Sequence, residues 1–279
     1  MIVYIFTKKQ QNMNEIIFSI VMLFQVSNGN VFSTATGFFY ESNGQIFLIT
    51  NRHVVNYSMT DSSAKLVIKI HTSKTDLSMF KTVEIPLVKD TKITWLGYSN
   101  PEIDVVAIPL EDIDISNTVI NTLSNKNFPP KGLELQVGSE LLVIGYPRGF
   151  TDKINQLPVA KNCIVSTPIE IPFDGRPYFL MDGNLFPGMS GSPVITKASS
   201  THNIDGGLSF SSSTQFFFMG IHSASFYKEI GIKENPIYTL ENGEIKIKGF
   251  NKEPVNENLS LQTCWYNGII EELTASRKK

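Results

Sequence analysis

Cysteine, charge and long apolar runs are all scarce in this sequence of 279 residues. The two cysteines, Cys163 and Cys264, each lie inside an apolar or aromatic stretch and are far apart in the chain. We therefore expect two buried thiols rather than the closely spaced disulfides of a small secreted domain. Lys and Arg number 24, Asp and Glu number 26, and the longest basic run is the terminal 277–279. This balance argues against nucleic acid and against a polybasic membrane patch as partners.

The main apolar run covers residues 16–26 and is too short to span a bilayer. It has the length of a signal-peptide core, but Glu15 precedes it. The sequence Ser-Asn-Gly-Asn follows over residues 27–30, which predicts a turn and not a cleavage site. We expect this run to be the first strand of a hairpin in a cytoplasmic protein without a membrane segment.

Helical periodicity is rare as well. The hydrophobic residues, 42% of the chain, fall in short runs rich in Val, Ile, Phe and Tyr that Asn-Gly, Gly and Pro interrupt. This pattern is typical of strands. Asn43-Gly44 indicates a hairpin turn, and Asn267 can cap a helix over residues 268–275. The expected strands lie near residues 17–26, 32–40, 45–50, 65–71, 81–87, 92–97, 104–110, 140–146, 159–167, 177–182, 193–197, 215–223 and 259–266.

These strands form two groups of about six on either side of a polar stretch that contains Pro129 and Pro130. We therefore predict an all-β protein built from two similar units. The predicted divisions are an N-terminal extension over 1–15, a first unit over 16–110, a linker over 111–138, and a second unit over 139–279 that contains an inserted hairpin over 224–257 and the terminal helix.

The sharpest local motif is FPGMSGSP, residues 186–193. A serine between glycines in a tight turn can expose its Oγ, while the backbone N–H groups of Gly188 and Ser190 point together toward a developing oxyanion. Acyl transfer needs this geometry. An ordinary Gly/Ser turn has the same composition, so the motif needs partners elsewhere in the chain.

Two further motifs provide those partners. TNRHVV, residues 50–55, places His53 just after an apolar strand, and DVVAIPL, residues 104–110, places Asp104 at the start of another. A serine hydroxyl is a weak nucleophile until a base removes its proton, and a carboxylate makes an imidazole a reliable base by fixing its tautomer. The candidate roles are nucleophile for Ser190, base for His53 and orienting carboxylate for Asp104.

With TNRHVV, DVVAIPL and GMSGSPVI in this order, the chain resembles chymotrypsin-fold serine peptidases of the bacterial trypsin-like kind, which include HtrA-type and glutamyl-endopeptidase-type enzymes. The resemblance spans roughly residues 16–275. It implies two six-stranded antiparallel β-barrels with the active site between them, His53 and Asp104 on the first barrel and Ser190 on the second. The order His, Asp, Ser also argues against an α/β-hydrolase, in which the serine comes first.

The specificity pocket is less well defined. The resemblance places His222 and Ser223 on the strand that edges this pocket, where glutamyl endopeptidases carry a similar histidine that binds Glu or Gln. Leu185 lies where those enzymes usually have Thr or Ser, and Asn184 lies where digestive trypsin has its pocket aspartate. Two interpretations of His222 stay open, a group that binds the substrate side chain and a half-buried strand residue.

These residues predict a serine endopeptidase that needs no cofactor and acts on a protein or peptide. No spacing of Cys, His and Asp indicates a metal site, and His71 and His202, which have no partner motif, are expected to face solvent. The alternative is a peptide-binding module of the same fold that is non-catalytic or gated by a partner. Any regulatory partner, and the oligomeric state, are left open.

Overall fold

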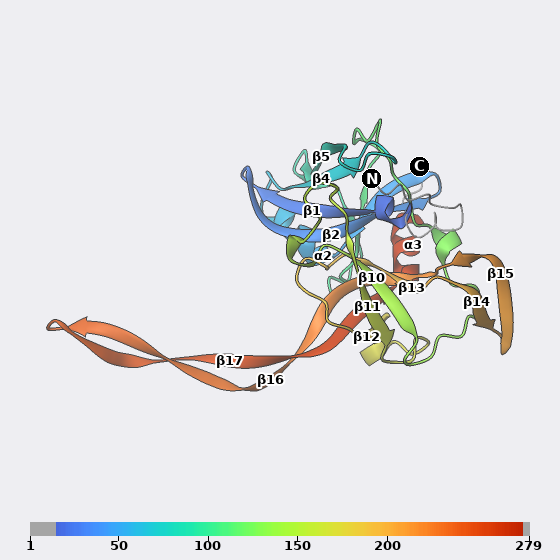
Figure 1. Ribbon diagram of the computed structural model, residues 1–279. Helices are drawn as coiled ribbons and strands as arrows, with labels where there is room; N and C mark the ends of the chain where they lie inside the picture. Colours follow the sequence, from blue (N-terminus) through green and yellow to red (C-terminus); the bar gives the residue numbers. More distant parts are fainter. Residues whose placement is uncertain (1–14, 276–279) are drawn as a thin grey trace, which may run out of the picture.

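The computed structural model describes residues 15–275 and consists mainly of β-strands (Figure 1). The predicted N-terminal extension lies outside this range except for Glu15. No helix between residues 15 and 275 is long and apolar enough to cross a membrane. The α-helices are α2 (Arg52–Val55) and α3 (Asn267–Ala275), and the 3-10 helices are η1 (Ile16–Ser19), η2 (Asn56–Met59), η3 (Asn125–Asn127), η4 (Pro147–Gly149) and η5 (Phe173–Gly175).

The first half of the chain forms an antiparallel sheet of seven strands in the spatial order β5-β4-β1-β2-β3-β9-β8. Asn28-Gly29 and Asn43-Gly44 have positive φ at both residues and join β1 to β2 and β2 to β3. Tight two-residue hairpin turns need this conformation, so both predicted turns are confirmed. The strands are β1 (Ile20–Ser27), β2 (Asn30–Ser42), β3 (Gln45–Thr50), β4 (Lys65–His71), β5 (Phe80–Pro86), β8 (Leu96–Gly97) and β9 (Val106–Pro109).

This sheet differs from the expected six-stranded first barrel. The strand predicted over 92–97 is divided, because Asp90 and Thr91 have positive φ and close a small separate hairpin. That hairpin consists of β6 (Val88–Lys89) and β7 (Lys92–Ile93). Only Leu96–Gly97 pairs with β9, as a seventh strand. The start of the predicted first strand is also helical, since residues 16–19 form η1.

The second half contains a closed antiparallel barrel in the order β10-β11-β12-β17-β16-β13, so this barrel has the predicted six strands. A hairpin that the sequence analysis did not predict, β14 (Ser199–Ile204) and β15 (Gly207–Gln215), turns at Asp205-Gly206 with positive φ at both residues. The barrel strands are β10 (Glu140–Gly145), β11 (Val159–Val165), β12 (Tyr178–Asp182), β13 (Pro193–Thr196), β16 (Phe218–Glu241) and β17 (Glu244–Tyr266).

Three hydrophobic clusters hold the fold together. One lies within the first sheet, and a second lies within the barrel. The third joins the two halves: Phe38 of β2 packs edge-to-face on Phe218 of β16 with ring centroids 5.4 Å apart. Burial of apolar surface from both halves in one cluster fixes the position of the first sheet against the barrel.

Helix α3 strengthens this connection. Its buried residues Ile269, Ile270 and Leu273 belong to the shared cluster. The Tyr40 hydroxyl of β2 donates to Glu271 Oε2 at 2.6 Å, so the helix is bonded to the first sheet as well as to the barrel chain that leads into it. The predicted terminal helix is confirmed and begins one residue earlier than expected.

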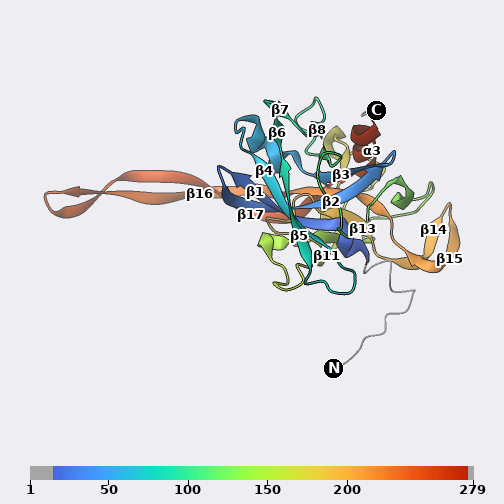
Figure 2. The same cartoon turned by 90° about the horizontal axis from the view of Figure 1, so that it is seen from above.

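A long two-stranded arm leaves the barrel. Strands β16 and β17 remain paired from Gly220 and Tyr266 at the barrel to Glu241 and Glu244 at the tip. Both views show this ribbon extending far from the rest of the molecule (Figures 1 and 2). We refer to residues 226–258 as the arm. It occupies the region of the predicted inserted hairpin, and its strands continue directly from the barrel strands.

The two cysteines are free and buried, as predicted. Burial raises the pKa of the Cys163 thiol to about 12, and burial also raises the pKa of Cys264. Both thiols are therefore protonated at neutral pH and act as packing residues within the barrel.

Candidate active site

His53 and Asp104 meet at the edge of the first sheet. His53 lies on the short helix α2, directly after β3, and Asp104 lies just before β9, which pairs with β3. Oδ2 of Asp104 is 2.7 Å from His53 Nδ1, and Oδ1 accepts the backbone N–H of His53 at 2.9 Å. The carboxylate thus holds both the ring and the backbone of the histidine.

The Asp104 carboxylate has a third donor, the hydroxyl of Ser223 on β16. Burial by itself would raise the pKa of Asp104, but the hydrogen bonds from His53 and Ser223 and the charge of a protonated His53 outweigh it and lower the pKa. Asp104 is therefore ionised at neutral pH. An ionised carboxylate at Nδ1 keeps the proton on that nitrogen and leaves Nε2 with a free lone pair.

Ser190 lies in the loop between β12 and β13. Gly188 and Gly191 on either side have φ of +92° and +88°. A Cβ on Gly188 would lie 2.5 Å from the Tyr146 carbonyl oxygen, and one on Gly191 would lie 2.0 Å from the Thr36 carbonyl oxygen. Both the conformation and the close approach of other backbone therefore require glycine at these positions.

The hydroxyl of Ser190 donates to the carbonyl oxygen of Ser223 at 3.1 Å. Within residues 15–275 no hydrogen bond joins Ser190 to His53. The structure therefore brings Asp104, His53 and Ser223 into one bonded group, and it connects Ser190 to that group through the backbone of Ser223.

Two peptide groups in the Ser190 loop have their carbonyl oxygens fixed. The oxygen of Pro187 accepts the N–H of Arg148 at 2.5 Å, and the oxygen of Met189 accepts the N–H of Ser192 at 3.0 Å. In a trans peptide the N–H points away from the C=O of the same group. The N–H groups of Gly188 and Ser190 therefore point the other way, and neither donates a hydrogen bond within the described chain.

Thr36 of β2 contacts the Ser190 loop and was not among the candidate site residues of the sequence analysis. Its hydroxyl donates to the Gly188 carbonyl oxygen at 2.8 Å and accepts the N–H of Tyr146 at 3.0 Å. Its own N–H donates to the Ser190 carbonyl oxygen at 2.9 Å. This buried threonine thus connects the first sheet to the Ser190 loop with two hydrogen bonds and to Tyr146, just after β10, with a third.

His222 is 3% exposed, so it is fully buried and not half-buried as the strand interpretation expected. Its Nδ1 lies 3.3 Å from the carbonyl oxygen of Thr263, which can only accept, so Nδ1 carries the proton. Burial lowers the pKa of His222 to about 4. The ring is therefore neutral at pH 7, with its proton on Nδ1.

The two candidate specificity residues in the loop before Ser190 differ in their exposure to solvent. Asn184 is exposed in the loop before Ser190. Leu185 is 3% exposed and packs in the barrel cluster with Met189 and Cys264. The expectation that His71 faces solvent is wrong. His71 is 6% exposed, and its Nε2 lies 2.8 Å from the Asn155 carbonyl oxygen.

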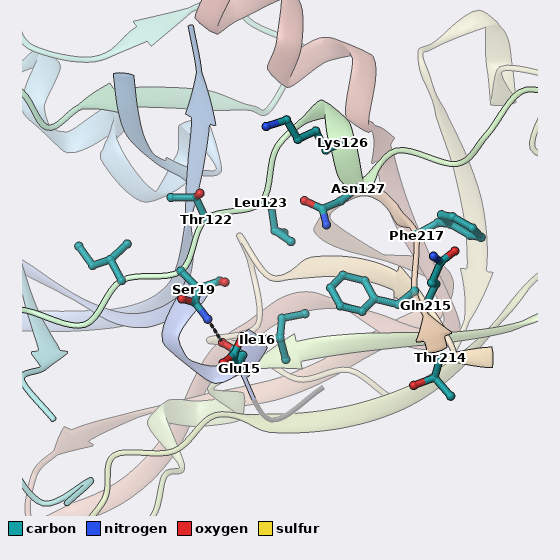
Figure 3. Close-up of a pocket in the computed structure, with 13 residues that line it drawn as sticks. Glu15, Ile16, Ser19, Thr122, Leu123, Lys126, Asn127, Thr214, Gln215 and Phe217 are labelled. Atoms are coloured by element: carbon teal, nitrogen blue, oxygen red, sulfur yellow. Dashed lines mark hydrogen bonds between the residues drawn. The ribbon is translucent and has the colours of Figure 1, made fainter. Parts of the chain in front are cut away.

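A cavity of about 540 Å3 lies away from these residues. Figure 3 shows Glu15, Ile16 and Ser19 on one side of it and Gln215 and Phe217 on another. None of His53, Asp104 and Ser190 lines it. Among residues 15–275 no group of three or more His, Cys, Asp or Glu side chains is arranged to hold a metal ion.

The model of the family described as "Trypsin-like peptidase domain" matches residues 35–200, which include all three motifs. No curated protein matches the chain. Similar solved structures include a serine endoprotease from Yersinia pestis, with 17% identity, a TM-score of 0.46 and coverage of 80% of this chain and 60% of that one. Deg5 has 16% identity and a TM-score of 0.48, and the match covers 79% of this chain and 87% of that one. The Rv3671c protease from M. tuberculosis has 14% identity and a TM-score of 0.46, and the match covers 94% of this chain and 82% of that one. The chain thus spans less than two thirds of the Yersinia pestis protein.

Proposed function

Because this chain belongs to the trypsin-like peptidase family, we propose that it is a serine endopeptidase in which Ser190, His53 and Asp104 form the catalytic triad. The observation that carries this proposal is the pair of hydrogen bonds by which Asp104 holds His53. They leave Nε2 as the proton acceptor that a serine nucleophile needs.

In the proposed reaction Ser190 Oγ forms a bond to the carbonyl carbon of the substrate peptide, and its proton passes to His53 Nε2. The C–N bond then breaks, and the leaving amine takes this proton from the imidazolium. Water repeats the same two steps on the acyl-enzyme, which frees the acid product and restores Ser190. Asp104 stays ionised throughout and stabilises the imidazolium.

The N–H groups of Gly188 and Ser190 are the proposed oxyanion hole. The fixed carbonyl groups of Pro187 and Met189 support this, because they orient both N–H groups before substrate binds. Donors that are already in place cost no reorganisation when charge develops on the substrate oxygen. Removing one such donor typically costs about a hundredfold to a thousandfold in turnover.

The bond from Ser190 to Ser223 supports a second candidate function, a peptide-binding module that is gated by a partner. In the peptidase, rotation about χ1 of Ser190 transfers this hydrogen bond from the Ser223 carbonyl to His53 Nε2. In a gated module the hydroxyl stays on Ser223 until a partner binds. Both candidates take a protein or peptide as ligand, as the family implies.

The proposed division of the chain follows the same scheme. The seven-stranded sheet would be the counterpart of the first barrel, over residues 16–110, with the linker over 111–138 and the second barrel over 139–279. Under this division His53 and Asp104 belong to the first unit and Ser190 to the second. Thr36 and the shared cluster would then keep the catalytic groups aligned.

Hydrolysis of an unfolded protein substrate tests the proposal. We expect Ser190→Ala to lower turnover by at least about four orders of magnitude. Ser192→Ala is the matched control, because the Ser192 hydroxyl is buried without a hydrogen-bond partner in the described chain and its loss should change turnover by less than about threefold. A folded wild-type protein that shows no hydrolysis would favour the gated module.

A further inference from the structure

One face of the arm is apolar and uncovered. Cross-strand partners and alternate residues of a strand share a face. The pairs Leu240 with Ile245 and Tyr238 with Ile247 therefore lie on one face near the tip. The register shifts by one residue of β17 between Ile237 and Tyr238, but the alternation along β16 is unbroken there, so the same face continues with the pairs Pro236 with Phe250, Glu234 with Lys252, and Ile232 with Pro254.

The opposite face of the arm is mainly polar. It carries Thr239 with Lys246, Asn235 with Asn251 and Lys233 with Glu253, together with the apolar Ile237 and, nearer the barrel, Val255 paired with Gly231. Asn235 and Asn251 both donate to Glu253 at 3.1 Å. The arm is thus an amphipathic ribbon, and such a ribbon normally has its apolar face against a core.

The apolar face has no core to cover it. Its six large side chains, Ile232, Tyr238, Leu240, Ile245, Ile247 and Phe250, are between 54% and 74% exposed. At this exposure they present on the order of 600 Å2 of apolar surface, at the upper end of what monomers show. A two-stranded hairpin alone is also marginally stable in water. Another surface must therefore cover this face.

We propose that the apolar face of the arm is the interface through which two copies of this chain form a dimer. Two arms stacked face to face about a two-fold axis make a four-stranded sandwich, which exceeds the three strands needed for independent stability. The arm extends away from the body in both views, so two arms can lie antiparallel with their bodies at opposite ends (Figures 1 and 2).

Charge and area fit a second copy. The one charged pair on the face, Glu234 and Lys252, is an ion pair at 3.0 Å, so two copies of the face meet without an uncompensated charge. The apolar surface, with the backbone and the two prolines around it, approaches the roughly 800 Å2 per partner of a stable interface. The arm contains five lysines and six glutamates, a net charge of −1, which gives an anionic bilayer no electrostatic attraction.

The test is the molar mass of the full chain, measured by light scattering and sedimentation over a range of concentrations. We expect twice the chain mass of 31.2 kDa for the wild type. Leu240→Glu with Ile247→Glu should weaken the dimer at least about a hundredfold, because each substitution occurs twice in a two-fold interface. Thr239→Glu with Asn235→Glu adds the same charge on the opposite face and should leave the dimer intact.

Since all four positions lie on the arm, outside the three hydrophobic clusters, we expect each double variant to keep the wild-type melting temperature within a few degrees, which verifies folding. A wild type that is monomeric at every concentration would overturn the proposal, and so would an apolar-face variant that stays dimeric. Co-sedimentation of a monomeric wild type with phosphatidylcholine and phosphatidylglycerol vesicles would instead assign the face to a membrane.

Discussion

The Thr36 hydroxyl of the first sheet donates to the Gly188 carbonyl oxygen of the barrel at 2.8 Å and accepts the Tyr146 N–H at 3.0 Å. The peptide group that precedes Gly188 is also held in place, because its carbonyl oxygen, that of Pro187, accepts the N–H of Arg148. Arg148 lies in the same segment as Tyr146. One hydroxyl therefore connects β2 both to Gly188 of the proposed oxyanion hole and to the segment of Tyr146 and Arg148 that holds the preceding peptide group. Thr36 is a positioning residue, since it acts on the reaction through Gly188.

Thr36→Val keeps the shape of the side chain and removes this hydroxyl. We expect kcat to fall by about tenfold to a hundredfold with little change in KM, because the oxyanion forms only after substrate has bound. Thr36→Ser restores the hydroxyl and should recover most of the turnover. Stability falls in the valine variant by about 1–3 kcal/mol, since the Tyr146 N–H loses its partner. Equal losses of kcat in both variants would contradict a role of the hydroxyl.

Asp104→Asn should lower turnover by about four orders of magnitude at neutral pH with the fold intact, because an amide no longer fixes the tautomer of His53. Glu102→Gln is the control. Glu102 is 61% exposed and pairs with Arg176 at 3.4 Å, so its loss should change turnover by less than about twofold. Steady-state kinetics and melting curves of both variants provide the comparison. A larger loss of turnover in the Glu102 variant than in the Asp104 variant would show that Asp104 is not the orienting carboxylate.

The sequence predicted the short-range parts of this structure well. Asn43-Gly44 and Asn28-Gly29 form the turns that their composition indicates, because few residue pairs tolerate positive φ twice in succession. The proximity of His53 and Asp104 also follows from the strand order, since β3 and β9 pair. Asp205-Gly206 is the same kind of signal, but the polar strands around it carry no alternating pattern, and that hairpin was missed.

Features that depend on contacts between distant segments could not be predicted. Thr36 is one β-branched residue in a strand of similar residues, and only the packed fold shows that Gly188 lies beside it. The continuous arm was hidden by Pro236 and Pro254, which usually interrupt strands but are tolerated in a ribbon with two open edges. His71 was expected in solvent because the sequence does not show that Asn155 covers it.

Buried His222 should make the protein less stable in acid. The unfolded chain binds a proton at this residue near pH 6.5, and the folded chain binds one only near pH 4, so stability falls as the pH decreases between these values. We expect a loss of about 2–3 kcal/mol from this residue between about pH 7 and pH 4.5.

Denaturant unfolding of the wild type and His222→Gln at both pH values isolates this contribution, because the carboxylates titrate equally in both proteins. The expected result is a smaller acid loss in the variant. His202→Gln, at a partly buried histidine outside the site, should show the wild-type loss. An acid loss in His222→Gln as large as that of the wild type would contradict the burial of a neutral ring.

The proton on Nδ1 of His222 also sets an expectation for specificity. A neutral ring in this tautomer offers only a lone pair at Nε2, which can accept from a Gln amide but cannot donate to a Glu carboxylate. At about pH 7.5 we therefore expect kcat/KM for a peptide with Gln on the acyl side of the scissile bond to equal or exceed that of its Glu counterpart. A tenfold preference for Glu would show a protonated ring. An equal loss of kcat/KM for all substrates in His222→Ala would favour the interpretation of His222 as a strand residue that does not bind the substrate side chain.

Covalent labelling with a fluorophosphonate, followed by mass mapping of the modified peptide, tests the central claim most directly. The probe reacts with a serine only where a base removes its proton and donors stabilise the oxyanion. We expect one adduct on the wild type, located on Ser190, and none on Ser190→Ala, while Ser192→Ala is labelled like the wild type. An unlabelled folded wild type, or an adduct on another serine, would contradict the assignment of Ser190, His53 and Asp104 as the catalytic triad.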